Sequence, residues 1–299
     1  MVEPILLAES PQLLAPSASR DDIGRSLEAA RITVWRVFEM PPDFSVCENA
    51  ENALSYVPVQ KETTPTVWLG YIPDAARYEA IYEEARQKKL QLLNSPAEHR
   101  MVQEFDAAYP FLEGMTPRSV MAWSVEEALA RAPEIGFPLF VKGGVQSRKS
   151  RGWSACVAQD EDELRARASV LLELEARSRG RVVLRELVKL RHTRQHGDFP
   201  LGREFRVFLL DGNIVARGYY WPHADALAQL SDEEARMVEA LATHAAKQIP
   251  ARFVALDCGQ LEGGEWTIIE SGDPQFAGLS QISALGYWNR LRGMLREGR

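Results

Sequence analysis

The feature that most constrains the fold is a pair of apolar runs near the C-terminus with two glycines between them. The stretch reads ALDCGQLEGGEWTIIESGD, residues 255–273. Strand-forming residues on both sides of a Gly-Gly pair predict an antiparallel hairpin with Gly263 and Gly264 as a two-residue turn. That turn would place Asp257 directly opposite Glu270, on the same face of the sheet.

Two opposed carboxylates repel each other, because their Cβ atoms lie only roughly 5 Å apart. A divalent metal ion offsets that repulsion, and Mg²⁺ prefers one or two carboxylates combined with substrate phosphates. Asp273 follows three residues after Glu270 and is a candidate for a further oxygen ligand. The hairpin by itself leaves two alternatives open: a solvated acid pair at a frayed strand end, or a bulge that spoils the register.

A basic, glycine-containing stretch could supply groups that bind phosphate beside such a metal. It reads FVKGGVQSRKSRGW, residues 140–153. Lys142 ends an apolar strand, where an ammonium is costly unless it meets an anion. The loop that follows contains Lys149, and its cations and N–H groups could cover phosphates. A solvated basic turn is the alternative. The Walker A pattern is absent, and a nucleic-acid patch is disfavoured because only Trp153 interrupts the cations.

Two further strands carry charged residues at positions that suit a nucleotide site. The run RVVLRELVKL, residues 181–190, predicts a buried strand whose edge could offer backbone groups to an adenine ring, with Glu186 as an added acceptor. A surface charge on an edge strand explains Glu186 equally well. The run GREFRVFLL, residues 202–210, places Glu204 and Arg206 on one face, where they could pair with each other or line the site.

Composition excludes several classes of protein. The chain has 299 residues and a formal net charge of −7, so it has no general attraction for nucleic acid or anionic membranes. Its three cysteines, Cys47, Cys156 and Cys258, form no CxxC pair, which favours a reduced protein without a zinc module. Neither a signal peptide nor a run of roughly 18 apolar residues is found. We therefore expect a cytoplasmic protein without a membrane partner.

The order of elements predicts an α/β unit followed by a second, larger unit. In the first unit we expect strands over residues 31–38 and 64–73 and a helix over residues 75–94. Two capping boxes are expected at the starts of later helices, Ser124 with Glu127 and Ser231 with Glu234.

The order of these pieces resembles the ATP-grasp superfamily over roughly residues 92–285: a strand ending in Lys142, a glycine-containing loop, then LRELV, GREFRVF, ALD and IIESGD. The details of REFRVF and IIESGDPQFAGL resemble the subgroup named for two arginines and a lysine. The resemblance implies an α+β fold in which two lobes hold ATP. Its implied segments are an N-terminal α/β domain (1–112), a small lid lobe (113–190) and a C-terminal lobe that binds metal and ATP (191–299).

The resemblance also implies a role for each candidate residue. The implied nucleotide-binding residues are Lys142, Lys149, Glu186, Leu187, Val188 and Glu204. Lys142 would contact the α-phosphate and adenine side, Lys149 the phosphates, and Glu204 the ribose or the metal. Glu186 and the backbone of Leu187 and Val188 would form the adenine hinge. Arg206 and Lys149 would act on the transferred phosphate, and Arg217 is a weaker candidate for the same role.

The implied metal site departs from the usual pattern of the superfamily. Asp257 and Glu270 would hold Mg²⁺. Most members have an asparagine two residues after the glutamate, whereas here Gly272 stands there and Asp273 follows. Asp273 is therefore the implied replacement, and the number of magnesium ions stays open.

The reaction implied by the resemblance is ATP-dependent ligation of a carboxylate to an amine through an acyl-phosphate. The substrates would be small-molecule or peptide carboxylates and amines, and nucleic acid is not expected as a partner. Two alternatives stay open: direct phosphoryl transfer from ATP, as in a kinase, and a nucleotide-binding regulatory protein without ligation. The sequence indicates neither the substrates nor the oligomeric state.

Overall fold

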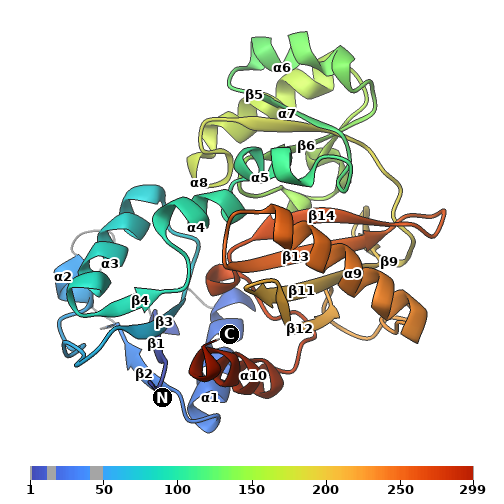
Figure 1. Ribbon diagram of the computed structural model, residues 1–299. Coiled ribbons are helices and arrows are strands. Elements are labelled where there is room, and N and C mark those ends of the chain that lie inside the picture. Colours follow the sequence, from blue (N-terminus) through green and yellow to red (C-terminus); the bar gives the residue numbers. More distant parts are fainter. Residues whose placement is uncertain (1, 12–17, 41–49, 299) are drawn as a thin grey trace.

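The computed structural model describes residues 2–11, 18–40 and 50–298, so Cys47 lies outside the described residues (Figure 1). Within these ranges, three four-stranded sheets follow one another along the chain, with helices packed on each. The predicted α+β class is confirmed.

The N-terminal sheet is parallel, with the strand order β2-β1-β3-β4. Its strands are β1 (Ile5–Ala8), β2 (Arg36–Glu39), β3 (Thr64–Leu69) and β4 (Leu90–Leu92). The accompanying helices are α1 (Ala18–Ile32), α2 (Ala50–Ala53) and α3 (Ala75–Gln87).

Two predictions in this unit are partly wrong. The expected strand over 31–38 begins only at Arg36, because the residues up to Ile32 continue α1. The expected helix over 75–94 ends at Gln87, where Lys89 takes a left-handed backbone conformation (φ 59°). This reversal lets β4 pair with β3 and bury its two outer leucines.

The middle sheet is antiparallel, with the order β5-β8-β6-β7. Its strands are β5 (Ser119–Ala122), β6 (Leu139–Gly143), β7 (Val157–Ala158) and β8 (Val182–Glu186), and its helices are α6 (Val125–Arg131), α7 (Glu161–Glu173) and α8 (Glu175–Ser178). One face packs on α6 and α7 through residues such as Val141 and Leu184. Because side chains alternate along a strand, Phe140, Lys142 and Arg185 point from the other face.

The C-terminal sheet is antiparallel, with the order β12-β11-β13-β14. Its strands are β11 (Glu204–Leu210), β12 (Asn213–Tyr219), β13 (Phe253–Gln260) and β14 (Trp266–Gly272), and the hairpin of β9 (His192–His196) and β10 (Phe199–Gly202) precedes it. Helix α9 (Asp232–Gln248) covers one face through a core that includes Val207 and Leu256. Helices α4 (Pro96–Gln103) and α5 (Phe105–Leu112) connect the N-terminal unit to the middle sheet.

The last helix, α10 (Ala284–Glu297), returns to the N-terminal unit and lies beside α1 (Figure 1). Trp35 and Trp288 meet edge to face in this contact, and the Trp35 indole donates to the Trp288 carbonyl at 2.9 Å. The three sheets fall within the three predicted segments, while this contact joins the first segment to the last. The segment boundaries themselves stay a prediction.

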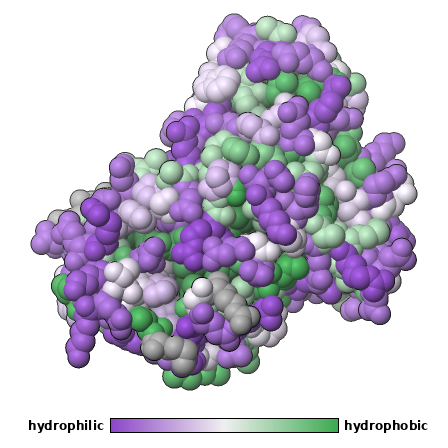
Figure 2. Space-filling view, in the orientation of Figure 1, coloured by the Kyte–Doolittle hydropathy of each residue, from purple (hydrophilic) through white to green (hydrophobic). Residues whose placement is uncertain are grey.

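Polar residues cover most of the face shown in Figure 2, and the apolar residues visible there form several separate patches. Among the described helices, none is both long enough and apolar enough to cross a membrane.

Candidate active site

The hairpin of β13 and β14 places Asp257 opposite Glu270, as predicted, but with a different turn. The Leu261 N–H donates to the Glu265 carbonyl at 2.8 Å, so three residues rather than two form the turn. The register then shifts by one residue between Asp257 and Cys258, which leaves Ile269 as a bulge in β14. The bulge offsets the longer turn and restores the predicted pairing.

Arg206 lies beside this acid pair and is the register partner of Asp257 on the neighbouring strand β11. Its Nε and Nη2 donate to the two carboxylate oxygens of Asp257, each at 2.8 Å, and its Nη1 donates to the Gly278 carbonyl at 2.8 Å. Arg206, Asp257 and Glu270 therefore form a row across one face of the sheet. The bidentate pair offsets much of the repulsion between the two acids.

Lys142 reaches Glu270 from the middle sheet and forms an ion pair with it. The Lys142 side chain is almost completely buried, and burial lowers its pKa below the ordinary value although Glu270 opposes the shift. Burial alone would raise the pKa of Glu270, but the nearby ammonium groups of Lys142 and Lys149 outweigh it and lower that pKa to about 2. This ion pair joins the two sheets across the site.

Lys149 enters the site from the loop between β6 and β7, at the start of the short helix η3 (Lys149–Arg151). Its Nζ lies 3.9 Å from Oε2 of Glu204 and 5.6 and 5.5 Å from the ring centres of Tyr220 and Trp221. Burial by itself disfavours its charge, but Glu204 and the other site acids raise the pKa of Lys149 above its ordinary value. Burial raises the pKa of Glu204 to about 7.

Gly152 and Asp198 hold the end of this loop. Gly152 has a φ of 91°, and a Cβ there would lie 2.4 Å from the Asp198 carboxylate. The same carboxylate accepts the Trp153 N–H at 2.9 Å. The loop that carries Lys149 is thereby fastened to the β9–β10 hairpin.

The two sheets enclose a cleft with two connected pockets. The first has a volume of about 340 Å³ and is mainly apolar, with Phe140, Leu187, Val188, Phe199 and Ile269 in its wall and Lys142, Arg185, Glu186 and Glu204 around it. The second has a volume of about 520 Å³ and contains Arg206, Tyr220, Trp221, Asp257 and Ser271. Both pockets include Ser147, Lys149 and Glu270, so their contents would meet at the lysine and the glutamate.

The predicted hinge lies along the wall of the first pocket. Strand pairing ends at Glu186, so Leu187 and Val188 follow the sheet directly. The Glu186 N–H donates to the Arg118 carbonyl at 2.8 Å, and its half-exposed carboxylate lies 4.0 Å from the Arg118 guanidinium. The structure therefore brings together the predicted residues Lys142, Lys149, Glu186, Leu187, Val188, Glu204, Arg206, Asp257 and Glu270.

Arg217 is not brought into this cleft. It is the register partner of Val207 and therefore points to the face of the sheet that α9 covers, opposite to the face of Arg206. Its Nε donates to the Glu239 carboxylate on α9 at 2.7 Å. The one-residue alternation of a strand explains why the returning strand supplies no second arginine.

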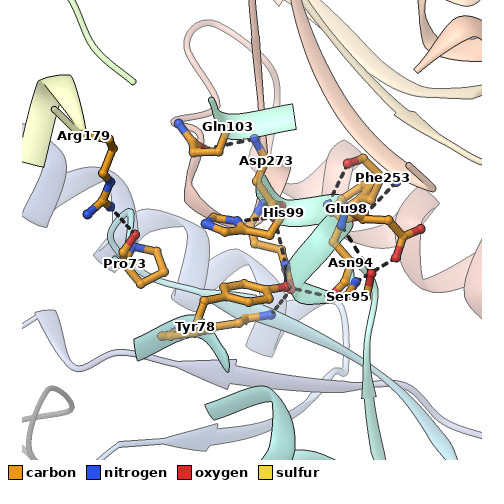
Figure 3. A network of polar contacts seen from close by, with 12 residues as sticks. Pro73, Tyr78, Asn94, Ser95, Glu98, His99, Gln103, Arg179, Phe253 and Asp273 are labelled. Carbon is orange, nitrogen blue, oxygen red and sulfur yellow. Dashed lines mark hydrogen bonds and ion pairs between the residues drawn. The ribbon is translucent and has the colours of Figure 1, made fainter. Parts of the chain in front are cut away.

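Asp273 also lies apart from the acid pair. Its side chain is fully buried, with Oδ2 2.9 Å from Nδ1 of His99 and Oδ1 accepting the Gln275 N–H at 3.1 Å (Figure 3). The Asp273 N–H donates to the Gln103 side chain at 3.2 Å. The carboxylate thus joins η5 (Pro274–Phe276) to helix α4 rather than facing Asp257 and Glu270.

Sequence reasoning missed several residues that line the cleft. Arg185 is buried beside Lys142, and Tyr220 lies under both Lys149 and Arg206, whose guanidinium is 4.7 Å from the ring centre. Trp221, for which a pocket role ranked below a strand-end role, does line the second pocket. The available signal was the aromatic pair at the end of β12, a common place for side chains that leave a sheet toward a site.

The residues fit a magnesium ion that enters with a nucleotide better than a site built by protein alone. Among the described residues, no three His, Cys, Asp or Glu side chains lie close enough to form a metal site. However, the buried Oε2 of Glu204 has no hydrogen-bond partner, and the Asp257–Glu270 pair offers further carboxylate oxygens. Mg²⁺ ordinarily combines one or two such carboxylates with phosphate oxygens.

Comparisons with known proteins agree with this geometry. No curated protein matches the sequence. A D-alanine–D-alanine ligase from Bacillus anthracis matches in structure with a TM-score of 0.64 and 13% identity, over 99% of this chain and 97% of that one. A RimK domain ATP-grasp protein from Sphaerobacter thermophilus matches with a TM-score of 0.57 and 12% identity, over 97% and 99%. The ATP-grasp ligase PsnB matches with a TM-score of 0.55 and 15% identity, over all of both chains.

At these identities the three structures show a shared fold. The sequence itself matches an ATP-grasp domain family, the third family of the clade named for two arginines and a lysine, over residues 132–291, more than half of the chain. That range contains Lys142, Lys149, the hinge and the row from Arg206 to Glu270. The chain therefore belongs to this third family of the two-arginine, one-lysine clade of ATP-grasp domains.

Proposed function

We propose that this protein is an ATP-dependent ligase that joins a carboxylate to an amine through an acyl-phosphate. The observation that carries the proposal is the meeting of two different pockets at Lys149 and Glu270. The apolar pocket beside the hinge suits a purine base, and the polar pocket beside Arg206 suits the substrates. A phosphoryl group at the junction would lie within reach of both.

Each charged residue then has a task. Lys142 and Lys149 bind phosphate oxygens, and Arg206 faces the transferred phosphoryl group while Asp257 holds its guanidinium in position. Glu204 binds the ribose or the metal, and Asp257 and Glu270 hold Mg²⁺. When bound, Mg²⁺ offsets charge on the phosphate oxygens. The loop around Lys149 excludes water from the junction, which protects an acyl-phosphate from hydrolysis.

Two structural neighbours support the proposal. A D-alanine–D-alanine ligase of the same fold was solved in complex with ATP. An N5-carboxyaminoimidazole synthase from Aspergillus clavatus, which matches with a TM-score of 0.55 and 13% identity over 91% of this chain and 70% of that one, was solved with ADP and 5-aminoimidazole ribonucleotide. Both are proteins that place a nucleotide in this fold, and the family membership makes ATP the first nucleotide to test.

The test combines ADP release with trapping of the acyl group. The protein is incubated with Mg²⁺-ATP, a panel of amino acids and dipeptides as carboxylates, and hydroxylamine as the amine. We expect at least one carboxylate to give both ADP and a hydroxamate. Arg206→Gln should lower hydroxamate formation by about 100-fold or more. Arg252→Gln is the matched control, since Arg252 pairs with Asp211 on the exterior and should retain the wild-type rate.

The other outcomes identify the alternatives. ADP release with a phosphorylated acceptor and no hydroxamate would show a kinase. ATP binding with no ADP release across the panel would favour a nucleotide-binding regulatory protein. Either result would overturn the ligase.

A further inference from the structure

Arg185 is a buried cation in the first pocket to which neither the pattern of motifs nor the proposed reaction assigns a role. It lies on β8 in register with Ser119 on β5 and Phe140 on β6, one residue before the hinge. Its side chain shares the face of Lys142 and lines the same pocket. Only 5% of the residue is exposed.

The contacts of Arg185 fix its guanidinium and leave one end unused. Nη1 donates to the Ile269 carbonyl at 2.6 Å and Nε to the Ser119 hydroxyl at 3.3 Å. The guanidinium carbon lies 4.2 Å from the centre of the Phe105 ring. Nη2 is buried without a hydrogen-bond partner, and no described carboxylate forms an ion pair with Arg185.

A guanidinium in this position is costly without an anion. Arginine stays charged in proteins, and a buried charge without a partner is strongly disfavoured. Burial lowers the pKa of Arg185 to about 10, with Glu270 opposing the shift from a distance. Lys142, the neighbouring cation on this face, already has Glu270 as its partner, whereas Arg185 has none.

We propose that Arg185 is a phosphate-binding residue whose Nη2 donates to a phosphate oxygen of the nucleotide in the first pocket. The proposal rests on the proposed function, because it requires a nucleotide in the cleft. A base next to Leu187 and Val188 leaves its phosphates to extend toward Lys149 past the face that carries Arg185 and Lys142. The bonds to Ile269 and Ser119 hold the guanidinium in place before the nucleotide arrives, so little order is lost on binding.

The bulge in β14 contributes to this arrangement. Ile269 is the bulged residue, and its carbonyl is the acceptor that holds Nη1. One irregularity in the metal hairpin therefore sets both the opposition of the two acids and the position of a guanidinium on the opposing sheet.

Calorimetry on Arg185→Gln and Arg185→Lys tests the proposal, with Mg²⁺-ADP and adenosine as the probes. We expect Arg185→Gln to weaken ADP binding by about 10- to 100-fold and to leave adenosine binding unchanged, because only ADP carries phosphate. Arg185→Lys should retain an intermediate affinity, since it keeps the charge and loses the planar fork. Arg131→Gln is the control: Arg131 lies in the same lobe, outside the cleft, and also donates to a backbone carbonyl.

Thermal unfolding without nucleotide separates this role from a structural one. Removing an unpaired buried cation should leave the midpoint of Arg185→Gln at or above the wild-type value, while the rise caused by ADP becomes smaller. A lower midpoint with an unchanged rise would overturn the proposal, as would equal losses for ADP and adenosine. If the wild-type protein binds ADP and Arg185→Gln binds it equally well, only this inference fails. If the wild-type protein binds no adenine nucleotide, the proposed function fails with it.

Discussion

At the scale of single residues, the site is a set of carboxylates that each have a separate cation. The sequence indicates the repulsion between Asp257 and Glu270, but it does not indicate that Arg206 and Lys142 relieve it. Lys142 is 128 residues from Glu270, and the two meet only when two sheets face each other. Spacing along the chain therefore identified the charged residues, while their partners depended on tertiary structure.

The Arg206–Asp257 pair should contribute strongly to stability because it is buried. Asp257→Asn would leave the guanidinium without its charge partner, and we expect a loss of about 3 to 5 kcal/mol in the free energy of unfolding. Asp211→Asn is the control, because Asp211 also pairs bidentately with an arginine, Arg252, but on the exterior. That change should cost less than about 1 kcal/mol. Urea denaturation measures both, and equal losses would contradict the argument.

Glu204 should make stability depend on pH near neutrality. Its pKa rises from 4.5 to about 7 on folding, so the folded protein retains a proton that the unfolded chain loses. The free energy of unfolding should therefore fall as the pH rises from 4.5 through 7, by roughly 3 kcal/mol in total. Glu204→Gln removes this dependence. Subtracting its urea-denaturation curve from that of the wild-type protein isolates the group, and a flat difference from pH 4.5 to 8 would refute the shift.

At the scale of elements, predictions succeeded where the signal was local. Ser231 and Glu234 form the predicted capping box of α9. Ser124 caps α6, but Glu127 accepts the Trp123 N–H instead of the Ser124 N–H, so that box is incomplete. Strand β1 was not predicted, because four apolar residues after a proline carry no periodicity. The longer turn and the bulge at Ile269 compensate each other and leave no mark in the sequence.

The fastening of the Lys149 loop can be tested at Gly152. Gly152→Ala places a Cβ against Asp198 in addition to the strain of a φ of 91°. Gly136→Ala is the matched control, since Gly136 has the same φ and no atom within 4 Å of the added Cβ. Both changes should cost about 1 to 2 kcal/mol of stability. Only Gly152→Ala should speed tryptic cleavage in the Lys149 loop, and similar cleavage of both variants would contradict the contact with Asp198.

At the scale of the whole molecule, buried polar contacts join the N-terminal unit to the C-terminal sheet. Asn94 exchanges two hydrogen bonds with the backbone of Phe253, at 2.9 and 3.1 Å, and Tyr78 donates to the Asn94 carbonyl at 2.7 Å (Figure 3). His99 stacks on Tyr78 with ring centres 4.1 Å apart. Resemblance to a family predicted the lobes around the nucleotide. It did not predict this junction or the return of α10, since both depend on contacts between distant segments.

Asp273 distinguishes the junction from the metal site, because the sequence assigned it to the metal and the structure places it beside His99. Asp273→Asn removes a buried charge-assisted contact, so we expect a loss of about 1 to 3 kcal/mol in the free energy of unfolding. The gain in ADP affinity that Mg²⁺ produces, measured by calorimetry with the metal and with EDTA, should remain. Glu270→Gln should reduce that gain while Asp273 stays in place. If Asp273→Asn instead abolishes the gain and leaves stability unchanged, Asp273 is a metal ligand and the junction contact is incidental.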